Sequence, residues 1–383
     1  MDTIVKLSGF GDTLLGYLIP FLFVLTVVVF VHELGHFLVA RWCGVGIKAF
    51  SIGFGPEIVG FTDRHGTRWK ISWIPLGGYV KFIDDENVAS AGARRTLDQL
   101  TPEERARSFQ GKSLAQRAAV VAAGPIANFL LAIVVFTAIF GVFGERITAA
   151  KVDIVNPGSA AERAGFLPGD RVISIDGTAI ETFGEMQRIV AMSPDQPLHF
   201  VVDRGGKTIG ITVTPELKTI TDRFGNEMRM GLLGIQRKAA PEEWTLKRHD
   251  PVTAFVMAVK ETYFVISRSL GYLYDVVTGR ESADQLGGPI RIAQVSGQVA
   301  TAGFLALLNL CAIISVSIGL INLFPIPMLD GGHLLFYGIE ALRGRPLSEG
   351  TQEMGFRIGL AFVLMLMIFA TWNDLIHLKF LYE

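Results

Sequence analysis

The sequence predicts a polytopic α-helical membrane protein with four transmembrane helices, a membrane-associated β element and an inserted β-rich domain. Half of its 383 residues are hydrophobic, and the mean hydropathy is +0.41. Only 19% are charged, against about 25% in ordinary soluble chains. Four stretches are long and apolar enough to span a bilayer, by the rule of about 20 residues per crossing. These observations exclude a disordered chain and a typical cytosolic enzyme.

The four predicted spans cover residues 14–40, 118–143, 304–324 and 358–372. The chain between the second and third spans lacks such a stretch, so we expect it in water or at the membrane interface. The first span does not fit a cleavable signal peptide, because only Lys6 precedes it and it is longer than a typical signal core. With only Cys43 and Cys311, the chain is not a disulfide-dense scaffold. A net charge of −1 gives no reason to expect a nucleic-acid partner.

Basic residues place the loop between the first two spans in the cytoplasm. They cluster at both ends of this loop: Arg41, Lys48, Arg64, Arg68, Lys70 and Lys81 follow the first span, and Arg105, Arg107, Lys112 and Arg117 precede the second. The region between the second and third spans, and both termini, are then expected on the opposite side of the membrane.

Residues 1–143 are predicted to form the first two transmembrane helices and an intervening β-hairpin. Strand-like runs at 47–54 and 68–82 are broken by Gly and Pro. Their Trp, Phe and Tyr content is typical of membrane interfaces. The edge of such a hairpin could receive an extended peptide by strand addition. The alternative is a peripheral hairpin that only anchors the loop.

Residues 150–217 are predicted to form a small β-rich domain. A strand-like run leads into the turn Asn156-Pro157-Gly158, after which Ser159 can cap a short helix. Another strand at 171–175 ends at the turn signal Asp176-Gly177. These short strands and turns indicate a compact domain inserted between two pairs of spans.

The remainder of the chain is predicted in two parts. Residues 218–302 form a linker with one strand and then an amphipathic helix at 251–277, which lies on the membrane surface or against the spans. Residues 303–383 contain the last two transmembrane helices.

The strongest functional signal is the H-E-x-x-H motif His32-Glu33-Leu34-Gly35-His36 within the first span. Residues i and i+4 share a helix face, so both imidazoles can reach one metal ion. Glu33 lies beside that face and can take a proton from water, whose pKa zinc lowers from about 15.7 to about 7. Such groups in an apolar segment are costly unless they pair or bind a metal. The alternative is a polar patch satisfied by neighbouring helices.

A catalytic zinc ion takes three protein ligands and keeps one position open. Asp330 is predicted as the third ligand, because prolines break the helix before it and broken backbone at membrane depth lines cavities. The alternative for Asp330 is a loop residue or a helix N-cap at the membrane surface. His333 is a competing ligand that we rank below Asp330 and expect to support the ligands. Asn322 is predicted to donate a hydrogen bond to the substrate carbonyl or its oxyanion, against the alternative of an interhelical hydrogen bond.

Together these motifs resemble the bacterial site-2 proteases, the peptidase M50-like intramembrane zinc metalloproteases that include the regulators of the sigma-E stress response. Residues 156–177 resemble the PDZ fold in its bacterial, protease-associated form, and residues 124–129 are similar to the family's second-span motif. The resemblance covers nearly the whole chain. It implies that the zinc ligands are His32, His36 and Asp330, and that Glu33 is the catalytic base.

The resemblance also implies a cofactor, substrates and a location. The cofactor is Zn²⁺, and the substrates are single-pass membrane proteins already trimmed by a site-1 protease, such as anti-sigma factors, together with remnant signal peptides. The protein is expected as a monomer in the lipid bilayer of a bacterial inner membrane. Its PDZ domain and both termini would be periplasmic, and the H-E-x-x-H motif near the cytoplasmic side. One PDZ domain here, where the best-known relatives carry two, is a departure from the family pattern.

Two functions of other classes compete with a protease. One is a membrane-anchored PDZ adaptor whose metal is only structural, and the other is a transporter, since charges within a membrane also mark ion paths. A structural metal site has no need of an acid such as Glu33 between its two histidines. Four spans without visible repeat halves argue against a transporter.

Overall fold

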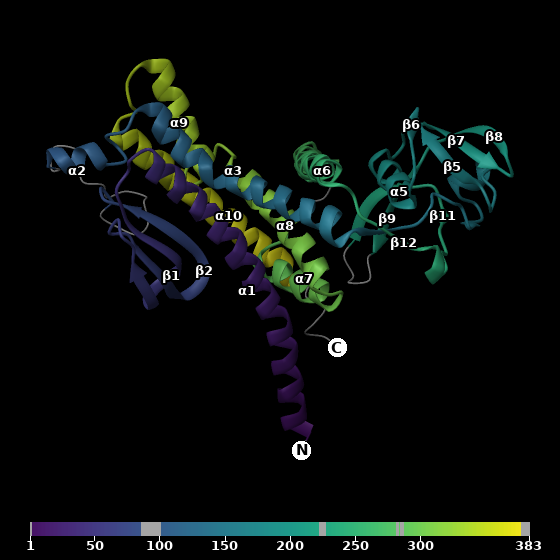
Figure 1. The fold of residues 1–383 in the computed structure, drawn as a ribbon, viewed down its shortest axis with the longest axis horizontal. Coiled ribbons are helices and arrows are strands. Elements are labelled where there is room, and N and C mark those ends of the chain that lie inside the picture. Colours follow the sequence, from purple (N-terminus) through teal and green to yellow (C-terminus); the bar gives the residue numbers. More distant parts are fainter. Residues whose placement is uncertain (1, 86–100, 222–226, 281–282, 284–286, 377–383) are drawn as a thin grey trace. The chain divides into compact units, whose positions relative to one another are not determined.

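The computed structural model describes residues 2–85, 101–221, 227–280, 283 and 287–376 (Figure 1). The chain divides into two units, each described by itself. The membrane unit comprises Met1–Ile139 and Pro251–Glu383, and the inserted unit comprises Phe140–Asp250. Among the described residues, four helical segments are long and apolar enough to cross a membrane. They are Leu15–Trp42, Leu114–Phe143, Phe304–Asn322 and Gly350–Ile376, so the four predicted spans are confirmed.

The helices that contain these spans are α1 (Asp2–Trp42), α3 (Leu114–Ala138, continued by the π-helical turn Ile139–Phe143), α8 (Phe304–Asn322) and α10 (Glu349–Ile376). The last helix begins well before the predicted start at residue 358. Its first turns carry Glu353 and Arg357, which form an exposed i,i+4 ion pair of 2.6 Å. Such a pair supports a helix but lowers its hydropathy. A prediction from apolar length therefore placed the start of this helix too late in the chain.

Three spans form the centre of the membrane unit, where α1, α3 and α8 pack on one another (Figure 1). Helix α7 (Pro289–Thr301) packs on α1 and α8, and α6 (Pro251–Val277) packs on α3 and α8. The buried face of α6 consists of Ala254, Ala258 and Thr262, small side chains at every fourth position that allow close helix contact. Two shorter helices, α2 (Pro102–Arg107) and α9 (Asp330–Arg343), complete this unit.

The predicted hairpin consists of the antiparallel strands β1 (Ile47–Thr62) and β2 (Arg68–Phe82). The hairpin curls, because Ala49 faces both Arg68 and Lys81, near the two ends of β2. The first part of β1 therefore lies between the beginning and the end of β2 and pairs with both. Strand β2 also packs against α1. An aromatic cluster holds the hairpin on α1, with ring centroids of Phe37 and Trp69 4.8 Å apart and Phe50 packed on both. This packing fixes β2 beside the H-E-x-x-H motif.

The inserted unit is built on a four-stranded sheet in the order β6-β5-β7-β8. Its strands are β5 (Arg171–Ile175), β6 (Thr178–Ala179), β7 (Leu198–Arg204) and β8 (Lys207–Val213), and its helices are α4 (Ala160–Arg163) and α5 (Phe183–Met192). Ser159 caps α4 by accepting from the backbone amide of Glu162, as the sequence predicted. The hydrophobic core of the inserted unit contains Phe166, Val172, Phe200 and Val202.

The inserted unit extends to Asp250, beyond the boundary predicted at residue 217. Two short strands return to its beginning: β11 (Ile235–Gln236) pairs with β4 (Ile154–Val155), and β12 (Thr245–Lys247) pairs with β3 (Glu145–Ile147). Along the chain, the hairpin of β9 (Glu216–Thr221) and β10 (Glu227–Leu232) follows the sheet and precedes these two strands. The predicted linker at 218–302 is thus divided, and only its second part joins the membrane unit. Strands of two or three residues carry no alternation by which a sequence could reveal them.

Asp63 organises the turn between β1 and β2. Its Oδ1 atom accepts hydrogen bonds from the backbone amides of His65 and Thr67, at 2.8 and 3.0 Å. Its Oδ2 atom accepts from the Trp69 indole at 3.2 Å and from the Arg41 guanidinium at 3.1 Å. Burial alone raises the pKa of the Asp63 carboxyl, but these donors outweigh it and lower the pKa from 3.8 to about 2.

Asp63→Asn is expected to lower the midpoint of thermal unfolding near pH 7. Because the folded pKa lies below the unfolded one, the charged carboxylate stabilises the fold above about pH 4, and this contribution is lost as the pH falls towards 2. The difference between wild type and variant should therefore shrink as the pH falls from about 4 towards 2. Glu353→Gln, which breaks an exposed ion pair worth little, is the control. A difference that is equal at both pH values would contradict this prediction.

Candidate metal centre

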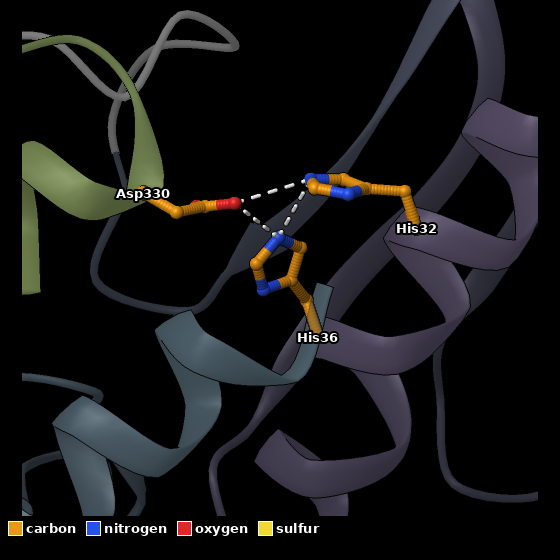
Figure 2. Close-up of side chains that lie close together, drawn as sticks. All are labelled: His32, His36 and Asp330. Carbon is orange, nitrogen blue, oxygen red and sulfur yellow. Dashed lines mark hydrogen bonds and ion pairs between the residues drawn. The ribbon is translucent and has the colours of Figure 1, made fainter. Parts of the chain in front are cut away.

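Three side chains that could hold a metal ion converge in the membrane unit (Figure 2). His32 and His36 lie one helical turn apart on α1, and Asp330 is the first residue of α9. The two Nε2 atoms are 3.2 Å apart, and they lie 3.2 and 3.5 Å from Oδ2 of Asp330. Within the described part of the chain, this is the group whose ligand atoms all lie within 4.8 Å of one another. The structure thus brings together the three residues predicted as ligands.

The chemistry of this donor set fits a zinc ion. Nδ1 of His36 lies 2.8 Å from the backbone carbonyl of Val120, which can only accept. A neutral His36 therefore carries its proton on Nδ1 and turns the lone pair of Nε2 towards His32 and Asp330. The buried Oδ2 atom of Asp330 has no described hydrogen-bond partner besides the two imidazoles. Two imidazole nitrogens and a carboxylate oxygen form a typical catalytic zinc set that leaves one position open.

Glycine allows α3 to pass directly behind the two histidines. A Cβ atom on Gly124 would clash with Nε2 of His36 and would lie 2.9 Å from Cε1 of His32. On the facing helix, a Cβ atom on Gly35 would clash with the carbonyl oxygen of Ala123. The helices α1 and α3 therefore approach as closely as two backbones can, and the imidazoles occupy the space above Gly124.

A tight turn from α8 to α9 places Asp330. Two prolines interrupt the helix, and Met328 takes a φ of +95°, a backbone conformation that L side chains rarely adopt. Glycine again allows close packing: a Cβ atom on Gly332 would clash with the carbonyl oxygen of Ile326, and one on Gly359 of α10 with that of Pro327. The turn is thus held between its own helix and the last span, with Asp330 directed at α1 (Figure 2).

Glu33 lies between α1 and β2. Its carboxylate lies next to the Val80 backbone. A Cβ atom on Gly78 would lie only 3.1 Å from Cγ of Glu33, so a glycine is needed for β2 to come this close. This contact places Glu33, the predicted catalytic base, next to the two histidines and at the edge of a strand.

A cavity of about 400 Å³ opens onto this centre. Its polar wall contains the three candidate ligands and Glu33, and its other walls come from β2, the turn before α9, α9 and α10. The side chains of Tyr79, Met328, Tyr337 and Phe356 contribute to these walls. The centre is therefore partly enclosed and lined by both polar and apolar side chains, as ligand sites usually are.

The two remaining candidates of the sequence also line this cavity. Asn322 lies at the end of α8. His333 lies one turn after Asp330, and its ring packs on Phe356 with centroids 5.2 Å apart. His333 is not part of the convergent group of three.

Sequence reasoning gave no role to Asn128, whose side-chain amide nitrogen lies 3.2 Å from Nδ1 of His32. It gave none either to the Val120 carbonyl behind His36. Asn128 had a usable signal, since it is a polar residue in an otherwise apolar span. A backbone carbonyl gives no such signal, because every residue carries one.

Comparisons with known proteins agree over nearly the whole chain. The profile of peptidase family M50 matches residues 20–366, a range that contains all three candidate ligands. A protein of Agrobacterium fabrum that is named as a zinc metalloprotease is 51% identical over 98% of this chain and 99% of its own length. Metalloprotease MmpA of Caulobacter vibrioides is 40% identical over 94% of this chain and 95% of its own. Protease RseP of Yersinia pestis is 32% identical, over 94% and 99%.

Gly124→Ala is expected to weaken zinc binding by about 10- to 100-fold, the cost typical of disturbing the groups around metal ligands. The new methyl group would displace the His36 imidazole, although alanine favours the helix itself. Zinc affinity can be measured by competition with a chelator in detergent. Gly16→Ala on α1, where an added Cβ atom meets nothing within 4 Å, is the control. Equal affinities of Gly124→Ala and wild type would contradict this account of α3.

Gly359→Ala tests whether α10 positions Asp330 through the turn. The added methyl group would push Pro327 away, so we expect weaker zinc binding although residue 359 is far from the metal centre in sequence. The matched control is Gly350→Ala, on the same helix and in open space. If Gly359→Ala binds zinc as tightly as the control, the last span does not fix the third side chain.

Proposed function

Because this chain belongs to peptidase family M50 and is a zinc metalloprotease with four membrane-spanning helices, we propose that it cleaves single-pass membrane proteins within or beside the bilayer. One observation carries the proposal. Two imidazoles from a helix apolar enough to span the membrane converge with a carboxylate from α9, and Glu33 lies beside them. A water-requiring reaction at that depth needs a partly enclosed polar site, and the cavity at this centre has that character.

His32, His36 and Asp330 would hold the zinc ion. Their side chains are partly buried, with 11%, 13% and 17% of their surface exposed. When bound, zinc supplies Lewis acidity towards a carbonyl oxygen and towards water. The protein's contribution is to hold the three donor atoms ready, so that little reorganisation accompanies binding.

Glu33 would act as the general base and then as the general acid. It would take a proton from the attacking water and return it to the leaving amine as the peptide bond breaks. Its contact with the Val80 backbone supports this role, because it holds the carboxylate at the cavity wall. Asn322, on another wall of the same cavity, would donate a hydrogen bond to the carbonyl oxygen that gains negative charge.

The substrate would lie extended along β2. A transmembrane helix must unwind before cleavage, because its carbonyls are engaged in hydrogen bonds to amides four residues on. Gly78, Tyr79 and Val80 line the cavity, and the antiparallel register Phe50↔Val80 uses one side of this strand. The Val80 backbone also reaches Glu33, so the other side of β2 faces the centre. An unwound segment could pair with this side and thereby present its carbonyls to the metal centre.

The inserted unit would select substrates as a PDZ domain. It would either exclude untrimmed proteins by size or bind the new C-termini of trimmed ones. We favour exclusion, so that only substrates already shortened by a site-1 protease reach the cavity. Anti-sigma factors trimmed in this way are the proposed substrates, together with remnant signal peptides. The basic residues that flank the first two spans support an inner-membrane protein whose inserted unit and termini are periplasmic.

Glu33→Gln is expected to abolish cleavage of a tagged, trimmed single-pass substrate in liposomes while zinc remains bound. General acid–base catalysis contributes about 10²- to 10⁴-fold to the rate, so the cleavage rate of the variant should be at least about 10²-fold below that of wild type. Glu353→Gln, the same chemical change at an exposed position of α10, should leave the rate unchanged. A zinc-loaded Glu33→Gln variant that cleaves at the wild-type rate would overturn the role of Glu33. If wild type and variant both hold zinc and neither cleaves any of several trimmed substrates, the adaptor with a structural metal is favoured.

A further inference from the structure

Each candidate histidine ligand is held from behind by one group of α3. Nδ1 of His36 meets the Val120 carbonyl at 2.8 Å, and Nδ1 of His32 meets the Asn128 side-chain amide at 3.2 Å. These two partners differ in kind. A carbonyl only accepts a hydrogen bond, whereas a carboxamide can accept through its oxygen or donate through its nitrogen. The protonation pattern of His36 is therefore fixed by the backbone, but that of His32 depends on how Asn128 is turned.

Asn128 is completely buried, and α8 fixes its position. Its backbone carbonyl accepts a hydrogen bond of 2.9 Å from the Ser315 hydroxyl of α8. Its Cβ atom lies 3.1 Å from where a Cβ atom on Gly319, one turn further along α8, would stand. Substantial movement of the residue is thus prevented, and the remaining freedom is a half-turn of the terminal amide, which exchanges its oxygen and nitrogen.

The oxygen of this amide has no described hydrogen-bond partner, although it is buried. Buried amide oxygens are nearly always paired. Among the described residues, the hydrogen-bond partner of this side-chain amide is the His32 ring. A half-turn would place the oxygen on Nδ1 of His32, in the position that the amide nitrogen now occupies.

We propose that Asn128 is a positioning residue that decides whether His32 can bind the metal. When its oxygen faces His32, it accepts the Nδ1 proton, and Nε2 keeps its lone pair for the ion. When its nitrogen faces His32, Nδ1 must accept, the proton lies on Nε2 and points at Oδ2 of Asp330, 3.2 Å away. In that second arrangement the protein itself fills the ligand space with a hydrogen bond. The inference rests on the proposed role of His32 as a ligand.

Substitutions at residue 128 separate these two orientations. Asn128→Asp can only accept at this position, so it should bind zinc at least as tightly as wild type. Asn128→Leu has a similar size and no acceptor, so it should lose about 10- to 100-fold in zinc affinity, as is typical when the partner of a ligating histidine is removed. Affinities are measured on the purified full-length protein by chelator competition, and thermal unfolding is followed in parallel. Ser317→Ala, on the same helix α8 but with its hydroxyl bonded to the Ile313 carbonyl of that helix, is the control and should bind zinc as wild type does.

The outcomes are distinguishable from a failure of the metal site itself. Loss of zinc from His32→Ala, with unchanged affinity in Asn128→Leu, would overturn the role of Asn128 alone. Unchanged zinc affinity in His32→Ala would overturn the ligand assignment. Equal losses in Asn128→Asp and Asn128→Leu would show that the amide is needed for shape or as a donor, and would also overturn the proposal. If Asn128→Leu does not fold, Asn128→Asp still decides, because a required donor would make it lose zinc and a required acceptor would not.

Discussion

The membrane unit depends on the cost of placing ionisable groups at membrane depth. The span in α1 carries three of them, His32, Glu33 and His36, and each is expensive in an apolar surrounding unless it has a partner. Every neighbour of this helix turn supplies one. Helix α3 gives a backbone carbonyl and an amide, β2 gives its backbone, and α9 gives a carboxylate. The packing of three separate segments around one turn of α1 is thus the condition under which that turn can exist in a membrane.

Small residues make this packing possible. Gly35 and Gly124 bring α1 and α3 together, Gly78 brings β2 to Glu33, and Gly359 receives the turn before α9. Without a hydrophobic driving force in lipid, helices associate through close contact and hydrogen bonds. Glycine at each contact point lets backbone, rather than a long side chain, define the distances. The metal centre is therefore surrounded by short connections with few rotatable bonds.

Much of this architecture could be predicted from the sequence, and the reasons for the misses are physical. The spans follow from apolar length, and the proximity of His32 and His36 from the helical period. Asp330 could be predicted from the prolines that precede it, but not its distance to α1, which is set by tertiary packing. The curl of the hairpin was not predictable. Both ends of β2 pair with the same part of β1, and a strand-like run of residues does not show that it will fold back on its partner in this way. Asn128 stands out as a polar residue in an apolar helix, but the sequence does not reveal that it faces His32.

The three proposed ligands come from distant parts of the chain. His32 and His36 lie in the first span, Asp330 follows the third, and the inserted unit is translated between them. A growing polypeptide therefore displays two imidazoles and Glu33 long before a third donor exists, and a catalytic zinc site uses three. With this proposed ligand set, a chain truncated before Asp330 would lack the third donor, and we expect it to be proteolytically inactive.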